Sequence, residues 1–378
     1  MPRSTHGTAT HRSTTLRKPL ATAALSAVAV GLSFIAEKVG IPAAWIFAFL
    51  VVFGIYAIVG DRQVTPPKKA MIPAQVIVAL LCTAPLTTSS LATIASYAGP
   101  TIISLAVTLA VCALASWLLV RFHRTSPTTA TLATLAGGAS AMVMLSNELK
   151  ADTRFVTLTQ YLRVSIVVLT LPAFVGVLGT LADSGPGEAG VASPQEENLL
   201  ATNWHGIVGC IVIGVAVWAF TKVTARWFTV SSPYLLLSIA FAMIAVMGLG
   251  VPVEYISPDG LVVDAAYALI GIQAGGTLTK SALRQFVRAL PVIVGVIALM
   301  MATSVAAAFA IAGIWDFPVL DAYLATVPGG IYAVIAFAHE AGTEPIVTVI
   351  QVMRVIAMLV VGAYAPQLIK LFWGRRHH

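Results

Sequence analysis

Residues 137–164 read GGASAMVMLSNELKADTRFVTLTQYLRV, and this stretch decides how the whole chain is interpreted. Its tail, VTLTQYLRV at 156–164, returns as VTVIQVMRV at 347–355. Both copies follow a pair of glycines, and both carry an arginine into an otherwise apolar run. An arginine is costly in such a run, so its repetition indicates a duplicated unit in which this residue has a purpose.

The composition is that of an integral membrane protein. Of the 378 residues, 58% are hydrophobic and 10% are charged, which is more apolar than one soluble core can hide. Several runs approach the roughly 20 apolar residues that a helix needs to cross a bilayer core of about 30 Å. We therefore expect an all-α protein in the lipid bilayer. No nucleic-acid partner is expected, because the formal charge of +7 is spread over short loops.

The two halves align when the sequence is shifted along itself by 191 or 192 positions. The shift matches glycine pairs, glutamates, glutamines and arginines in order, namely Gly137-Gly138 with Gly329-Gly330, Glu148 with Glu340, Gln160 with Gln351, and Arg163 with Arg354. The predicted organisation is a disordered basic cytoplasmic tail (1–18), a first membrane repeat (19–184), a polar extracytoplasmic linker (185–203) and a second membrane repeat (204–374).

The basic residues indicate the topology. Apolar runs predict five spans per unit, while the segments around the glycine pairs, 126–150 and 317–342, either cross the membrane or enter and return. Lysine and arginine mark the cytoplasmic side. If these segments return and both termini are cytoplasmic, 19 of the 22 basic residues lie inside and only Lys38 lies outside. We therefore predict about ten transmembrane helices in two inverted five-helix repeats, each with a re-entrant hairpin that contains a glycine pair.

Inverted repeats with helix breaks at matching points indicate a secondary transporter whose site lies between the halves, at the midplane of the bilayer. Glycines at the hairpin tips allow positive φ and close backbone approach. Threonine, glutamine and arginine follow at three-residue steps in each unit, so they share a helical face. A guanidinium beside an amide suits a carboxylate or a phosphate. The predicted binding residues are Gly137, Gly138, Thr157, Gln160, Arg163, Gly329, Gly330, Thr348, Gln351 and Arg354.

An alternative role for the arginines is ion pairing with carboxylates of their own units, which would be Glu148, Asp152, Glu340 and Glu344. Glu148 and Glu340 are also candidates for sodium or proton coupling, because carboxylates near a polar cavity can have shifted pKa values. Weaker candidates for the cavity are Asp264, Gln75 and Gln273.

At these residues the sequence resembles the AbrB-type membrane proteins with a duplicated domain, a bacterial family often labelled an ammonia monooxygenase or a regulator of AidB expression. The resemblance covers nearly the whole chain and rests on IPAAW at 41, AGGASAMVML at 136, ADTRFVTLTQYLRV at 151, PGGIYAVIAF at 328 and IQVMRV at 350. It implies a multi-pass protein of the bacterial inner membrane. An unrelated soluble DNA-binding protein shares the name.

Transport of a small organic anion by alternating access is the function that these residues favour, with no cofactor and with a homo-oligomer as one compatible assembly. Neither an enzyme nor a metal site is expected. Copper or iron chemistry needs clustered ligands, whereas the seven histidines are dispersed and the three cysteines lack CxxC spacing. The alternative is a membrane-embedded regulator or sensor without transport, in which the arginines form structural pairs.

Overall fold

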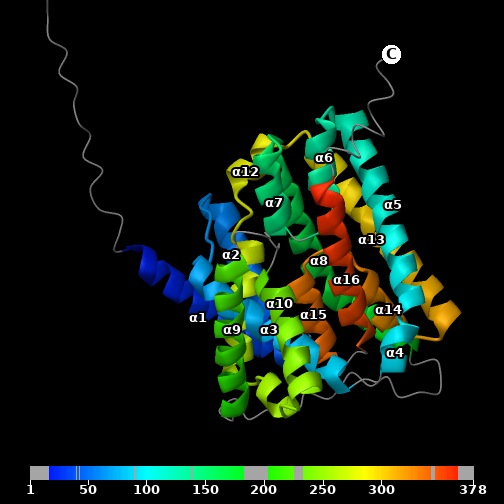
Figure 1. Cartoon of the computed structure of the whole chain (residues 1–378). Coiled ribbons are helices and arrows are strands. Elements are labelled where there is room, and N and C mark those ends of the chain that lie inside the picture. Colours follow the sequence, from blue (N-terminus) through cyan, green and yellow to red (C-terminus); the bar gives the residue numbers. More distant parts are fainter. Residues whose placement is uncertain are drawn as a thin grey trace, which may run out of the picture.

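The computed structural model describes residues 17–39, 41, 43–88, 91–137, 139–182, 203–224, 233–341 and 345–364. This part of the chain is helical and contains no strand (Figure 1). Each of the ten apolar runs contains a helix. Five helical segments are long and apolar enough to cross a membrane: Ala98–His123, Thr153–Phe174, Trp204–Val223, Val253–Gln285 and Leu290–Trp315. The all-helical fold is thus confirmed, while the ten spans, the inverted repeats and the re-entrant hairpins stay predictions.

The two halves have a similar order of helices. The first contains α1 (Arg17–Lys38), α2 (Ala44–Gly60), α3 (Lys68–Thr88), α4 (Leu91–Ser96), α5 (Ala98–His123), α6 (Pro127–Thr134), α7 (Ala139–Glu148) and α8 (Thr153–Ala182). The second contains α9 (Trp204–Thr224), α10 (Pro233–Met243), the π-helix η1 (Ile244–Gly248), the 3₁₀ helix η2 (Val253–Ile256), α11 (Leu261–Gly275), α12 (Lys280–Gln285), α13 (Leu290–Trp315), α14 (Val319–Thr326), α15 (Ile331–Glu340) and α16 (Ile346–Ala363).

Both glycine-pair segments are broken helices. The chain is non-helical between α6 and α7 and again between α14 and α15. Ser126 starts α6, because its Oγ accepts a hydrogen bond from the backbone N–H of Thr129 at 3.2 Å. The second break needs glycine, since φ is +125° at Gly329 and +64° at Gly330. Gly138 lies outside the described residues.

Helices from the two halves interleave. α2 packs on α11 and α3 packs on α10, and these are corresponding pairs under the shift of 191 or 192 positions. α5 packs on α13, and the two run along one side of the molecule, with α8, α15 and α16 between them and the group of α3, α9 and α10 (Figure 1). The broken helices therefore lie inside the protein, with most of the residues of α14 and α15 buried.

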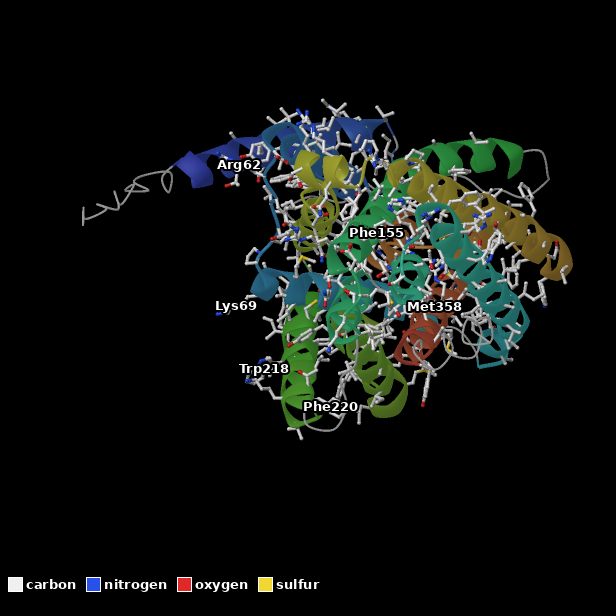
Figure 2. The ribbon with its side chains drawn as sticks, turned by 90° about the horizontal axis from the view of Figure 1, so that it is seen from above. Arg62, Lys69, Phe155, Trp218, Phe220 and Met358 are labelled. Atoms are coloured by element: carbon white, nitrogen blue, oxygen red, sulfur yellow. The ribbon has the colours of Figure 1, made fainter. Side chains whose placement is uncertain are left out.

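The outer surface is apolar. Seen from above, Phe155 and Met358 lie within the molecule, whereas Trp218 of α9 is at its edge (Figure 2). Phe155 and Met358 are buried and Trp218 is 51% exposed. Further exposed apolar side chains follow the same helix, including Val208, Ile211, Val212 and Val215. Such a surface suits contact with lipid chains rather than water.

Three glycines bring the backbones of α2 and α11 into contact. A Cβ at Gly275 would lie 2.2 Å from the carbonyl oxygen of Leu50, and one at Gly271 would lie 2.5 Å from that of Ile46. Gly54 on α2 faces Gly275 in turn. Small residues four apart allow membrane helices to approach closely. This approach fixes the position of α11, which carries Gln273 between its two glycines.

Replacing Gly275 with alanine should destabilise the protein, because the new methyl group would overlap the backbone of Leu50. Overpacking of this kind typically costs about 1–3 kcal/mol. Thermal unfolding of the purified protein in detergent measures the effect as a fall in Tm. Gly295→Ala on α13 is the matched control, since nothing lies within 4 Å of its added Cβ. Equal losses in the two variants would contradict the close approach.

Candidate functional site

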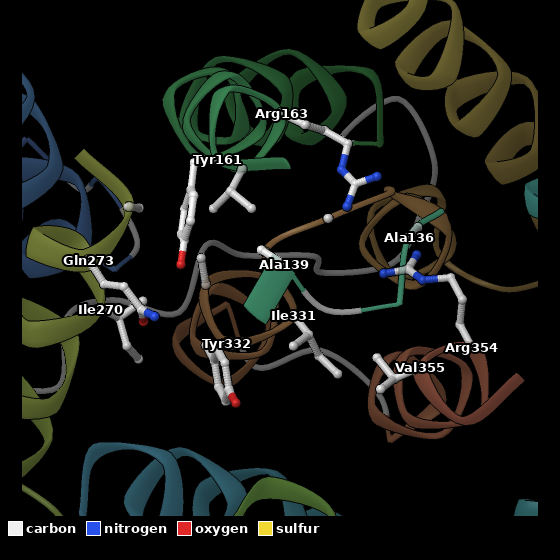
Figure 3. A pocket seen from close by; sticks show the side chains of 15 residues that line it. Ala136, Ala139, Tyr161, Arg163, Ile270, Gln273, Ile331, Tyr332, Arg354 and Val355 are labelled. Carbon is white, nitrogen blue, oxygen red and sulfur yellow. The ribbon is translucent and has the colours of Figure 1, made fainter. Parts of the chain in front are cut away.

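A cavity of about 70 Å³ lies where both helix breaks meet α8, α11 and α16 (Figure 3). Its lining comes from both halves of the chain: Ala136, Ala139, Tyr161, Arg163 and Val164 from the first, and Ile270, Gln273, Ala274, Gly329, Gly330, Ile331, Tyr332, Ala333, Arg354 and Val355 from the second. At roughly 10–15 Å³ for each water, the cavity has room for about five water molecules or a small solute.

Arg163 of α8 binds the end of α6. Its Nη1 donates to the carbonyl oxygens of Thr134 at 3.1 Å and Leu135 at 3.4 Å. Its Nη2 donates to Oε1 of Gln160 at 2.7 Å. Thr134 is the last residue of α6 and Leu135 follows it, so the guanidinium meets carbonyls that the helix leaves unbonded. Its positive charge also matches the negative end of the helix dipole.

The amide of Gln160 completes this contact. Nε2 donates to the carbonyl oxygen of Leu132 at 2.8 Å and to that of Leu135 at 3.0 Å. A neighbouring helix holds the same end from another direction, because the Thr134 hydroxyl donates to the carbonyl of Cys112 at 3.2 Å, and the Cys112 thiol donates to that of Thr134 at 3.3 Å. The end of α6 is thereby fixed to α5 and α8 together.

The second half repeats these bonds at matching positions. Nη1 of Arg354 donates to the carbonyl oxygen of Val327 at 2.7 Å, and its Nη2 donates to Gln351 Oε1. Gln351 Nε2 donates to the carbonyl oxygen of Leu324 at 2.7 Å. Ser304 takes the place of Cys112, since its hydroxyl donates to the carbonyl of Thr326 at 3.2 Å. The last carbonyl groups before each break thus accept hydrogen bonds from one glutamine and one arginine of a neighbouring helix.

Most of the described polar groups that face the cavity without a hydrogen-bond partner are donors. Arg163 and Arg354 are 2% and 0% exposed, and the Nε of each has no partner among the described residues. A Cβ at Gly329 would lie 2.9 Å from the Nε of Arg163, so a larger residue at this position would crowd the guanidinium. The first N–H groups of α15 also lie at the cavity, where Gly330 provides no side-chain cap. These groups give the cavity a positive character that suits an anion.

The structure brings together some of the predicted binding residues. Arg163, Arg354, Gly329 and Gly330 line the cavity, and Figure 3 shows the two guanidinium groups approaching it from α8 and α16. Gln160 and Gln351 are not part of the lining, because their amides donate to carbonyls at the helix ends. The remaining predicted residues that are described, Gly137, Thr157 and Thr348, are not part of the lining.

These three residues are placed by local packing and bonding. The Thr157 hydroxyl donates within its own helix, to the carbonyl of Thr153 at 2.6 Å. Thr348 is buried on α16. Gly137 packs on α16, where an added Cβ would lie 2.8 Å from the Cβ of Met358. Their expected part in binding stays a prediction.

Of the carboxylates considered for pairing or coupling, the described side chain of Asp152 lies away from Arg163. Asp152 starts α8, where its Oδ1 accepts from the backbone N–H groups of Arg154 and Phe155, both at 3.1 Å. It is therefore not the partner of Arg163, which lies about 16 Å further along the helix at 1.5 Å per residue. Glu148 and Glu340 end α7 and α15, far from the breaks, and their side chains, like all of Glu344, lie outside the described residues.

Sequence reasoning missed part of the cavity. Tyr161 and Tyr332 line it, and Gln273, a weaker candidate, lies beside Tyr161 (Figure 3). Tyr161 stands between Gln160 and Arg163 in the repeated tail, so its position in the motif was the available signal. Asp321 was also missed: it is 4% exposed on α14, at the position that Thr129 occupies in the first half. Within the described ranges, no three side chains of His, Cys, Asp or Glu are placed to bind a metal.

Comparisons with known proteins match almost the whole chain. The sequence profile of the family described as "Transition state regulatory protein AbrB" matches residues 45–372. "Putative regulator AbrB" of Escherichia coli strain K12 is 28% identical over 321 residues, which are 82% of this chain and 85% of that protein. "Uncharacterized protein YhjN" of Bacillus subtilis strain 168 is 28% identical over 279 residues, 70% of this chain and 67% of that protein. The profile match includes both helix breaks and both arginines.

Replacing Gln351 with leucine should destabilise the protein, because the carbonyl of Leu324 would lose a buried donor and Arg354 would lose the acceptor of its Nη2. Leaving such groups unsatisfied costs about 1–3 kcal/mol. Thermal unfolding should show a lower Tm than in wild type. Met353→Leu, on the exposed face of the same helix, should unfold close to wild type. A Gln351→Leu protein as stable as this control would contradict the capping role.

Proposed function

The chain belongs to the AbrB family, and we propose that it is a secondary transporter of a small organic anion in the bacterial cytoplasmic membrane. The proposal includes ten transmembrane helices in two inverted repeats, with both termini in the cytoplasm. The two broken segments are taken as re-entrant hairpins whose tips meet at the midplane. Neither a cofactor nor an enzymatic step is part of this function, and a homo-oligomer is compatible with it.

The observation that carries the proposal is the pair of buried arginines at one cavity. The Nε of each has no partner among the described residues, and none of the described residues that line the cavity is a carboxylate. A buried charge is unfavourable unless it is paired. An anion in the cavity would meet both Nε groups and the N–H groups at the start of α15. The anion would then accept the hydrogen bonds that the arginines have left to donate, and its negative charge would be paired with theirs.

The placement of the cavity supports transport rather than static binding. Its walls come from α11, which packs on α2, and from α8, α15 and α16, which pack with the broken helices. In transporters with inverted repeats, one group of helices moves against the other around a fixed site at discontinuous helices. Movement of α2 and α11 against α8, α15, α16 and the broken helices would open the cavity to each side of the membrane in turn. Glu148 and Glu340 are proposed to couple this movement to sodium or protons.

A membrane-embedded regulator is the second candidate. It is favoured by the name of the Escherichia coli relative and by the bonds through which both arginines hold helix ends. In this case the arginines would serve the fold alone. The cavity would then bind no anion, which separates the two candidates experimentally.

Arg163→Gln and Arg354→Gln should each abolish anion binding. The test is thermal stability of the purified protein with a panel of carboxylates and phosphates, each with sodium and at two pH values. A ligand at a hundredfold excess over Kd stabilises the folded state by about 2.7 kcal/mol. Wild type should gain stability from at least one anion, and the two variants from none.

Arg154→Gln is the matched control, because Arg154 lies on α8 but is exposed at its start. This variant should respond to the same anion as wild type. Uptake of that anion into liposomes would then test transport directly. If no anion stabilises wild type, yet the two buried-arginine variants are much less stable, the regulatory function is favoured instead.

A further inference from the structure

The cavity is not symmetric, although its arginines are. Tyr161 corresponds to Val352 in the second half, and Gln273 corresponds to Leu81 in the first. Both counterparts are apolar, so the repeat does not supply this phenol and amide a second time; Tyr332 is a further phenol in the lining. Figure 3 shows Tyr161 and Gln273 on the side opposite the two arginines, with Ala139 and Ile331 between. A ligand bound in this cavity therefore meets two different polar ends.

The Tyr161 and Gln273 side chains have bonding capacity to spare. They lie beside each other (Figure 3), and both line the cavity. A phenol can donate one bond and accept others, while a primary amide has two donors and an acceptor. Even with one bond between the two, donors and acceptors would remain for a neutral polar group. Neither side chain is charged at neutral pH, so this end has no reason to prefer a second negative charge.

The wall between the two polar ends is mainly apolar. It includes Val164, Ile270, Ile331 and Val355. Such side chains suit the carbon chain of a ligand better than a fully hydrated inorganic ion. The volume of about 70 Å³ limits that chain to a few carbon atoms.

We propose that the cavity binds a short carboxylate with a hydroxyl group at its far end. The carboxylate accepts hydrogen bonds from Nε of Arg163 and Arg354, and the hydroxyl bonds to Tyr161 and Gln273. This inference rests on the proposed anion site and adds a specificity that the arginines alone cannot supply. Tyr161 and Gln273 act on the part of the ligand that is not charged, so they determine which carboxylate is preferred.

The experiment uses straight-chain carboxylates from acetate to valerate, each beside its analogue with a hydroxyl on the terminal carbon. Dissociation constants are obtained from ligand-dependent thermal stability of the full chain in detergent. One neutral hydrogen bond to a buried polar pair changes affinity by up to about tenfold. For one chain length, wild type should therefore bind the hydroxylated member about tenfold more tightly. In Tyr161→Phe this preference should fall, because only Gln273 then remains to bond the hydroxyl, while the affinity for the plain carboxylate is kept.

Tyr364→Phe is the control, because this tyrosine lies after α16 and is 59% exposed. It should keep the preference of wild type. Equal binding of plain and hydroxylated carboxylates by wild type would overturn the inference while leaving the anion site intact. An unchanged preference in Tyr161→Phe would do the same. If no carboxylate binds wild type at all, the inference and the proposed function both fail.

Discussion

A helix that ends inside an apolar protein needs partners for its last carbonyl groups, and the centre of this structure is built around that need. α6 and α14 each end on a glutamine amide and an arginine guanidinium from a neighbouring long helix. Without these donors, the buried carbonyls would each carry a cost of several kcal/mol in a medium that cannot hydrogen-bond. The same bonds fix α8 and α16 beside the breaks and so determine where the two guanidinium groups lie.

Capping also changes how the arginines can bind an anion. The Nη groups of both residues donate to carbonyl and amide oxygens of the protein. A bidentate contact through both Nη atoms of one arginine is therefore not available in this state. What remains is one Nε from each arginine and the N–H groups at the start of α15. The structural bonds and the proposed binding contacts, which the sequence left as alternatives, thus fall on different atoms of the same side chains.

The repeat in the sequence predicted much of this centre. It located both breaks and paired Arg163 with Arg354, because glycines and charges in apolar runs are conspicuous. It could not show that Gln160 faces a helix end rather than a ligand, since three-residue spacing specifies a helical face but not what lies opposite. Tyr161 was overlooked for a related reason: an aromatic residue in a membrane span is unremarkable until its hydroxyl is seen beside Gln273. Whether the repeats are inverted depends on the placement of the bilayer, which the Lys and Arg distribution alone predicts.

The central claim is that both arginines serve one shared anion site. Titration calorimetry with the anion that stabilises the protein most would test it through the number of anions bound per chain. One shared site predicts one bound anion per chain in wild type and none after either Arg163→Gln or Arg354→Gln. Two bound anions in wild type, with one retained in each variant, would show two independent sites and contradict the account.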